Sequence, residues 1–123
     1  MDHTSALNNA WDVQTAASQL GFDWPDITGA FTKVEEEVSE IREAMMENDD
    51  THVQEELGDL LFAVVNLSRF VNLRPEIALN RATQKFQRRF DAVKQIIQEE
   101  NRTLAECTLA EMDAVWERVK GAE

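Results

Sequence analysis

Two short acidic motifs carry carboxylates at a spacing that could hold a metal ion. They are Glu36-Glu37-Val38-Ser39-Glu40 and Glu56-Leu57-Gly58-Asp59. In each motif two carboxylates lie three residues apart, so a helix would place them next to each other on one face. The sequence therefore predicts two pairs of neighbouring carboxylates, Glu37 with Glu40 and Glu56 with Asp59.

Both motifs interrupt an apolar stripe. At about 100° per residue, Glu37 and Glu56 each fall within the apolar pattern of their own segment, and Glu40 and Asp59 fall at its edges. The apolar residues assigned to these stripes are Val34, Val38, Ile41, Ala44, Met45, Leu60, Ala63, Val64 and Leu67. Carboxylates aimed at a core repel one another and lose hydration, so a positive charge must lie among them. No Lys or Arg is assigned to the stripes, and we therefore expect a divalent metal ion.

The residue types narrow the choice of metal. Ligand sets made only of oxygen favour Mg²⁺, with Mn²⁺ as a substitute, over zinc or copper. A di-iron helical bundle would carry a histidine where Asp59 stands, which argues against iron. The competing interpretation is that the Glu35–Glu37 run is a solvated acidic face, and the repeated spacing in the second motif favours the metal site over it.

Helical periodicity dominates the whole chain and predicts an all-α protein of one domain, residues 1–123. We expect helices over about 5–20, 27–47, 51–71, 75–100 and 108–119. Thr51 with Gln54 and Thr108 with Glu111 have the spacing of capping boxes. The short turn at residues 48–50 makes the second and third helices antiparallel neighbours, which brings the two acidic motifs to the same level.

Charge and composition exclude several functions. The net charge of −12 argues against binding a nucleic-acid polymer, although metal ions would still allow a phosphorylated small molecule to bind. No apolar run has membrane-spanning length, so we expect no membrane partner. The single Cys107 cannot form an internal disulfide and is typical of a reducing compartment, which predicts a cytoplasmic protein.

The densest basic segment is Lys85-Phe86-Gln87-Arg88-Arg89-Phe90. Lys85 and Arg89 are four residues apart and share a helix face, which Arg81 extends. They could bind phosphate, or they could pair with surface carboxylates in a chain so rich in glutamate. The pattern alone leaves both readings open.

Taken together, these segments resemble the MazG family of nucleoside triphosphate pyrophosphohydrolases. The resemblance rests on Glu36, Glu37, Glu40, Glu56 and Asp59 in the order Glu-Glu-x-x-Glu, gap, Glu-x-x-Asp, and runs from about residue 21 to residue 116. MazG proteins also have similar sequences around the two motifs, at residues Lys33–Glu37 and Glu55–Leu67. The Lys-Phe-x-x-Arg-Phe pattern of the basic segment is similar to theirs as well. One departure is Ala82-Thr83-Gln84-Lys85-Phe86, where the family often has Asn in place of Thr83, and this weakens any inference about substrate preference.

The resemblance implies a four-helix-bundle-like fold with a short extra C-terminal helix, assembled as a homodimer or alternatively a tetramer. It also implies Mg²⁺-dependent hydrolysis of a nucleoside triphosphate between the α and β phosphates. Alternatives are a same-superfamily enzyme for dUTP or phosphoribosyl-ATP, and a nucleotide-binding regulatory module with little catalysis.

The resemblance also implies roles for individual residues of this chain. The implied metal ligands are Glu37, Glu40, Glu56 and Asp59, with Glu36 positioning the attacking water and Glu36, Glu37 and Glu56 taking part in catalysis. The implied triphosphate contacts are Lys33, Lys85 and Arg89, and Trp116 matches a position near the nucleotide. We expect Trp11 and Trp24 to be core or interface residues instead.

Overall fold

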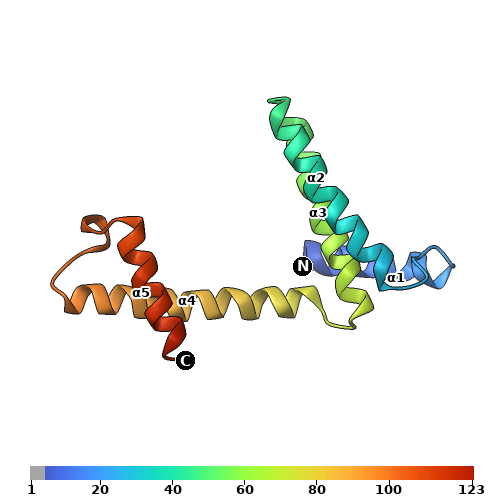
Figure 1. Cartoon of the computed structure of the whole chain (residues 1–123). Helices are drawn as coiled ribbons and strands as arrows, with labels where there is room; N and C mark the ends of the chain where they lie inside the picture. The colour runs from blue at the N-terminus through green and yellow to red at the C-terminus, as the bar shows by residue number, and fades with distance from the viewer. Residues whose placement is uncertain (1–4) are drawn as a thin grey trace. The chain divides into compact units, whose positions relative to one another are not determined.

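The computed structural model describes residues 5–123 and is all-α, as the periodicity predicts (Figure 1). Its helices are α1 (Ala6–Gln19), α2 (Ile27–Met46), α3 (Asp50–Phe70), α4 (Pro75–Glu99) and α5 (Leu109–Gly121), with a short 3₁₀ helix η1 (Leu104–Glu106) that the sequence reading missed. The predicted bounds agree with the observed ones within about two residues. Within the described part of the chain, no helix is long and apolar enough to cross a membrane.

Local sequence explains where the helices begin and end. Gly21 has a φ of 94° and ends α1, and Asn48 does the same for α2 with a φ of 55°. Both occupy the left-handed region that glycine and asparagine tolerate best. The capping box predicted at Thr51 is wrong, because Asp49 caps α3 by accepting hydrogen bonds from the backbone N–H of residues 51 and 52. The box at Thr108 and Glu111 is confirmed.

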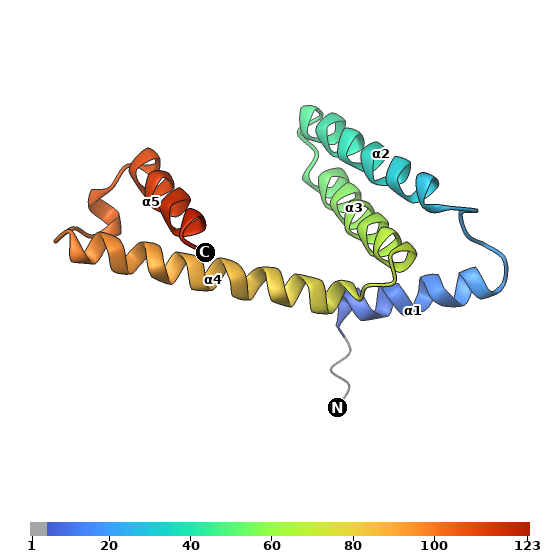
Figure 2. The ribbon, with the colours of Figure 1, turned by 60° about the horizontal axis from the view of Figure 1, so that its bottom comes forward.

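The described part of the chain forms two compact units, one that ends at Ala78 and one over residues 79–123, and each is described by itself. In the first unit α2 and α3 pack side by side as a hairpin, and α1 packs against α3 (Figures 1 and 2). The predicted antiparallel neighbours are therefore present. The single domain, the closed four-helix arrangement and the oligomer stay predictions.

The buried face of α2 is a narrow seam. Its three buried residues are Ala30, Glu37 and Ala44, each seven residues from the next. Val38 and Met45 lie about 80–100° around the helix from this seam and are largely exposed. Assigning Val38 and Met45 to the buried stripe of Glu37 was therefore wrong, whereas Ala44, assigned to the same stripe, is fully buried, and Val34 and Ile41 are half-buried.

The second unit contains the rest of α4, η1 and α5. Its core is formed by Val93, Ile97 and Val115, all nearly inaccessible to solvent. Trp116 and Cys107 pack against this core while remaining half-buried.

Candidate functional site

Carboxylates from both acidic motifs meet between α2 and α3. One oxygen each of Glu37, Glu56 and Asp59 lies within 4.8 Å of the others. The short turn before Asp50 and the matched distances of the motifs from it produce this meeting. The structure thus brings together three of the four predicted metal ligands, and Glu40 stands close enough to affect the pKa values of Glu37 and Glu56.

Two of these carboxylates are withdrawn from water. Glu37 is only 3% exposed, and the Glu56 side chain is 13% exposed. One oxygen of each, Oε2, is buried and receives no hydrogen bond from the described residues when the carboxyl groups are ionised. A buried carboxylate oxygen without a donor costs free energy, so contact with a cation would stabilise both atoms.

The position of Lys33 contradicts the expectation that no lysine or arginine reaches the apolar stripes. Its Nζ lies 3.0 Å from Glu37 Oε1 and 3.7 Å from a Glu36 oxygen, so a positive charge does reach the apolar seam. Lys33 precedes Glu37 by one helical turn, and its long side chain runs along α2 to the carboxylate. One lysine cannot offset several carboxylates, and the argument for a further cation still holds.

The pKa values of Glu37 and Glu56 also reflect this excess of negative charge. Burial is the largest effect on Glu37 and acts to raise its pKa, but hydrogen bonds from Lys33 and with Glu56 together hold that pKa below its usual value. Hydrogen bonding with Glu40, then burial, then Glu37 raise the pKa of Glu56 to about 7. The cluster therefore loses a proton near neutral pH and not near pH 4.5, as crowded carboxylates do when no cation is bound.

The cluster fits a divalent ion. It offers oxygen atoms only, two of them are buried without a donor, and its surplus negative charge is relieved by a proton in the absence of metal. Hard cations such as Mg²⁺ prefer this donor set. His52 also contacts Glu56, with its Nε2 3.3 Å from Glu56 Oε1, and hydrogen bonding to Glu47 raises the pKa of His52.

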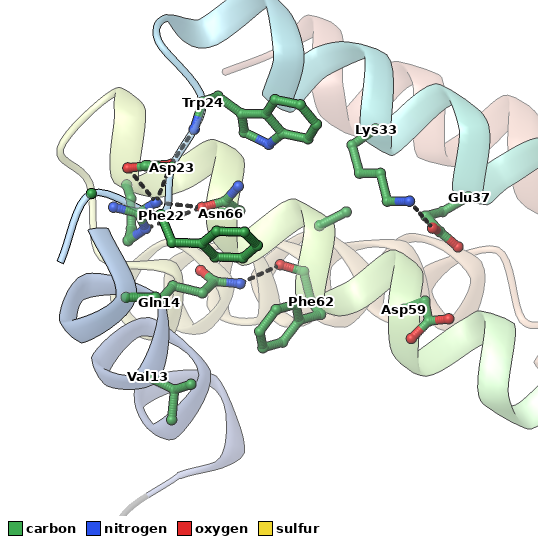
Figure 3. Close-up of a pocket in the computed structure, with 14 residues that line it drawn as sticks. Val13, Gln14, Phe22, Asp23, Trp24, Lys33, Glu37, Asp59, Phe62 and Asn66 are labelled. Carbon is green, nitrogen blue, oxygen red and sulfur yellow. Dashed lines mark hydrogen bonds and ion pairs between the residues drawn. The ribbon is translucent and has the colours of Figure 1, made fainter. Parts of the chain in front are cut away.

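The acidic cluster forms part of the wall of a cavity of about 690 Å³ in the first unit (Figure 3). The cluster residues on the wall are Glu37 and Asp59, and Lys33 lies beside them. The other residues that line the cavity are Val13, Gln14, Ala17, Gly21, Phe22, Asp23, Trp24, Phe62, Ala63, Asn66 and Arg69. Such a cavity is large enough for a small organic ligand.

Sequence reasoning missed the α1 side of this cavity. Gln14 is 6% exposed, and its Nε2 donates to the Phe62 carbonyl oxygen at 2.9 Å. A signal was present: Gln14 lies at helical spacing from Leu7, Trp11 and Ser18, so a carboxamide interrupts the inward face of α1.

An ion pair fixes the loop that carries Phe22 and Trp24. Arg69 Nη2 donates to both Asp23 oxygens at 2.9 and 3.0 Å, and it also donates to Asn66. Burial acts to raise the pKa of Asp23, but hydrogen bonds from Ser18 and Arg69 lower it overall. The loop is thus tied to α3 by a charged contact that is itself largely shielded from water.

Trp24 lies on the cavity wall, where the sequence reading expected a core or interface residue. Its ring rests against Gly29 in the first turn of α2. A Cβ at Gly29 would lie only 2.7 Å from two ring atoms, so only glycine lets the ring approach this closely.

The remaining predicted residues belong to the second unit. Arg89 donates through Nε and Nη2 to Glu123 at 2.8 and 2.9 Å, and its guanidinium lies 5.9 Å from the centre of the Trp116 ring. Trp116 in turn packs against Phe86, with ring centres 5.4 Å apart. Lys85 is exposed. Arg89 is therefore engaged by a carboxylate in this structure, as the surface-pair reading of the basic segment expects.

Comparisons with known proteins match the segment that contains the acidic cluster. A family model described as the MazG nucleotide pyrophosphohydrolase domain matches residues 26–94, which include both acidic motifs, Lys85 and Arg89. The chain is similar to the nucleoside triphosphate pyrophosphohydrolase/pyrophosphatase MazG of Thermotoga maritima, with 45% identity over 96% of this chain and 45% of that protein. It is also similar to the nucleoside triphosphate pyrophosphohydrolase of Escherichia coli K12, with 38% identity over 96% of this chain and 46% of that protein. The chain thus spans about half the length of these relatives.

Proposed function

Because this chain belongs to the MazG nucleotide pyrophosphohydrolase domain family, we propose that it hydrolyses nucleoside triphosphates between the α and β phosphates. The products are the nucleoside monophosphate and pyrophosphate. The observation that carries the proposal is the cluster of Glu37, Glu56 and Asp59, two of which, Glu37 and Asp59, line the same cavity as Lys33. Similar proteins are named for this activity, and the cluster supplies the donor set that a metal-dependent phosphate enzyme needs.

Mg²⁺ is the proposed cofactor, held by Glu37, Glu56 and Asp59 with Glu40 beside them. A bound divalent ion would offset phosphate charge and make water more acidic. Glu37 stays ionised through its contact with Lys33, and the buried Oε2 atoms of Glu37 and Glu56 would gain a partner. Glu36 is exposed next to Lys33, where it can accept a proton from the attacking water.

Phosphate contacts from this chain are proposed for Lys33, Lys85 and Arg89. Lys33 lines the cavity and is already placed at its acidic end. Arg89 would exchange the Glu123 carboxylate for a phosphate, since both present oxygen pairs to its guanidinium. Trp116, which packs beside Arg89, is the proposed nucleotide contact in the second unit.

The test is pyrophosphate release from a panel of canonical, deoxy and modified nucleoside triphosphates, with Mg²⁺ or with EDTA. We expect release with Mg²⁺ only, and a loss of at least about 100-fold in Glu56→Gln, since a ligand carboxylate is removed. Glu55→Gln is the matched control, because Glu55 is the adjacent exposed residue on the same helix.

The outcomes separate the alternatives. Release with dUTP or phosphoribosyl-ATP alone would identify the more specific superfamily enzyme. Binding of nucleotide without any release would support the regulatory module, and full activity of Glu56→Gln would contradict the metal assignment.

We also propose that the protein is a homodimer. Phe31, Val38 and Met45 repeat every seven residues along α2 and are 48%, 40% and 61% exposed. Such an apolar stripe on a helix of a small protein is typical of a surface that packs against another helix. Sedimentation of the wild type at micromolar concentration should give twice the mass of the monomer, and the Val38→Glu variant should have a lower mass. A tetramer is the alternative outcome. A monomeric wild type would refute the proposal.

A further inference from the structure

His52 contacts one of the proposed metal ligands but has no role in the proposed reaction. Its Nε2 lies 3.3 Å from Glu56 Oε1, and its Nδ1 lies 2.8 Å from Glu47 Oε2. The ring therefore lies between two carboxylates, one inside the acidic cluster and one outside it. Ionised carboxylates only accept hydrogen bonds, so the ring is the donor in both contacts when the two groups are ionised.

A matching contact exists on the other helix of the hairpin. Lys33 Nζ lies 3.0 Å from Glu37 Oε1, and Lys33 precedes Glu37 by four residues on α2. His52 precedes Glu56 by four residues on α3, so each nitrogen-bearing side chain starts one helical turn before its carboxylate. In both pairs one carboxylate oxygen has this contact, and the other oxygen is buried without a donor. Each pair thus leaves one oxygen available to a cation.

The turn between α2 and α3 determines where the His52 ring lies. The backbone N–H of His52 donates to Asp49, the N-cap of α3, at 3.3 Å. Glu47 is the C-cap of α2, and Asn48 then reverses the chain with a φ of 55°. His52 is therefore held through its backbone by one residue of the turn and through its ring by another.

Holding the Glu56 carboxyl group in place favours metal binding. A side chain that is free to rotate loses conformational entropy when it binds an ion, and a contact that already fixes it removes part of this cost. Residues that contact metal ligands in this way typically contribute about 10- to 100-fold to metal affinity.

We propose that His52 is a positioning residue that holds Glu56 ready to bind the metal ion, with Glu47 fixing the His52 ring. This inference rests on the proposed function, because it concerns the same metal cluster. His52 acts on the ion only through Glu56, as Lys33 does through Glu37.

The charge of the ring would have the opposite effect. A positive ring beside the cluster repels a divalent ion, so removing the charge alone would strengthen Mg²⁺ binding. Removing the contact that holds Glu56 would weaken Mg²⁺ binding. The direction of the change in affinity therefore separates the two effects.

The experiment measures the affinity for Mg²⁺ alone by calorimetry, so that it does not depend on turnover. We expect His52→Leu to bind Mg²⁺ about 10-fold more weakly than the wild type, because the contact with Glu56 is lost. His52→Gln keeps an N–H donor of similar reach without a charge, so it should bind Mg²⁺ at least as tightly as the wild type. Gln54→Leu, at an exposed position of the same helix, is the matched control and should leave the affinity unchanged.

Glu47 should act only through the ring of His52. Glu47→Ala should weaken Mg²⁺ binding about 2- to 5-fold in the wild type and should have no effect in the His52→Leu variant. An equal loss in both backgrounds would overturn the part of Glu47 in this inference, because Glu47 would then act through its own charge.

Equal Mg²⁺ affinities of the wild type and His52→Leu would overturn the inference, and so would equal losses in His52→Gln and His52→Leu. A lower melting temperature of metal-free His52→Leu with an unchanged Mg²⁺ affinity would show that His52 only stabilises the fold. Pyrophosphate release by the wild type with Mg²⁺ would leave the proposed function standing in each of these cases. A wild type that neither binds Mg²⁺ nor releases pyrophosphate would overturn both proposals.

Discussion

Mg²⁺ binding to the acidic cluster should release a proton in a measurable, pH-dependent way. The Glu56 carboxyl has a pKa of about 7 in the metal-free protein, because it shares a crowded site with Glu40 and Glu37. Only the ionised carboxylate binds a metal, so the proton must leave when Mg²⁺ enters. For a pKa of about 7, the expected release is about 0.9 proton at pH 6, about 0.5 at pH 7 and about 0.1 at pH 8.

The sign of the effect on folding stability is opposite to that of an ordinary ion-paired carboxylate. The pKa of Glu56 is raised in the folded protein from a usual value of 4.5. Its contribution to stability is therefore complete below about pH 4.5 and is lost as the pH rises through about 7. In the absence of metal, Glu56→Gln should raise the melting temperature at pH 8 and leave it nearly unchanged at pH 4.5.

Calorimetry in two buffers with different ionisation enthalpies counts the released protons, and Glu55→Gln is the control. Glu56→Gln should bind Mg²⁺ more weakly and release much less than 0.9 proton at about pH 6. No proton release by the wild type at this pH, or equal release by the Glu56→Gln variant, would refute the account of the cluster.

The remaining predictions concern packing and helix caps. Gly29→Ala should displace the Trp24 ring and weaken nucleotide binding, as measured by calorimetry, and the same nucleotide affinity in this variant and the wild type would contradict it. Gly58 has open space around it, so Gly58→Ala should stabilise α3 by about 0.5–1 kcal/mol in urea unfolding. Ile97→Ala should cost about 2–5 kcal/mol of unfolding free energy and Ile97→Val about 0.5–1.5 kcal/mol, because Ile97 is 1% exposed; a smaller loss for alanine than for valine in urea unfolding would be inconsistent with this core. Thr108→Ala should cost about 1 kcal/mol by removing the cap of α5, and Thr108→Ser should restore most of it in the same assay.

The sequence determined the helices and the composition of the acidic cluster. Helix periodicity and the stop signals Gly21 and Asn48 are local, because they depend on residues within one or two turns. The two motifs lie at similar distances from the short turn between α2 and α3, and the rise per residue therefore places them opposite each other. The meeting of Glu37 with Glu56 and Asp59 could thus be predicted from spacing alone. The cap at Asp49 was missed because Asp49 and Thr51 both have capping side chains, and backbone geometry selects between them.

Tertiary structure alone decided which faces are buried and what lines the cavity. Glu37 is buried between Ala30 and Ala44 on one face of α2, and the neighbouring Val38 stays exposed. Lys33 reaches Glu37 through a flexible side chain whose direction no periodicity specifies. Gln14 meets Phe62 from a segment 48 residues away in the sequence. Contacts of this kind depend on how helices pack, and packing joins residues that share no local pattern in the chain.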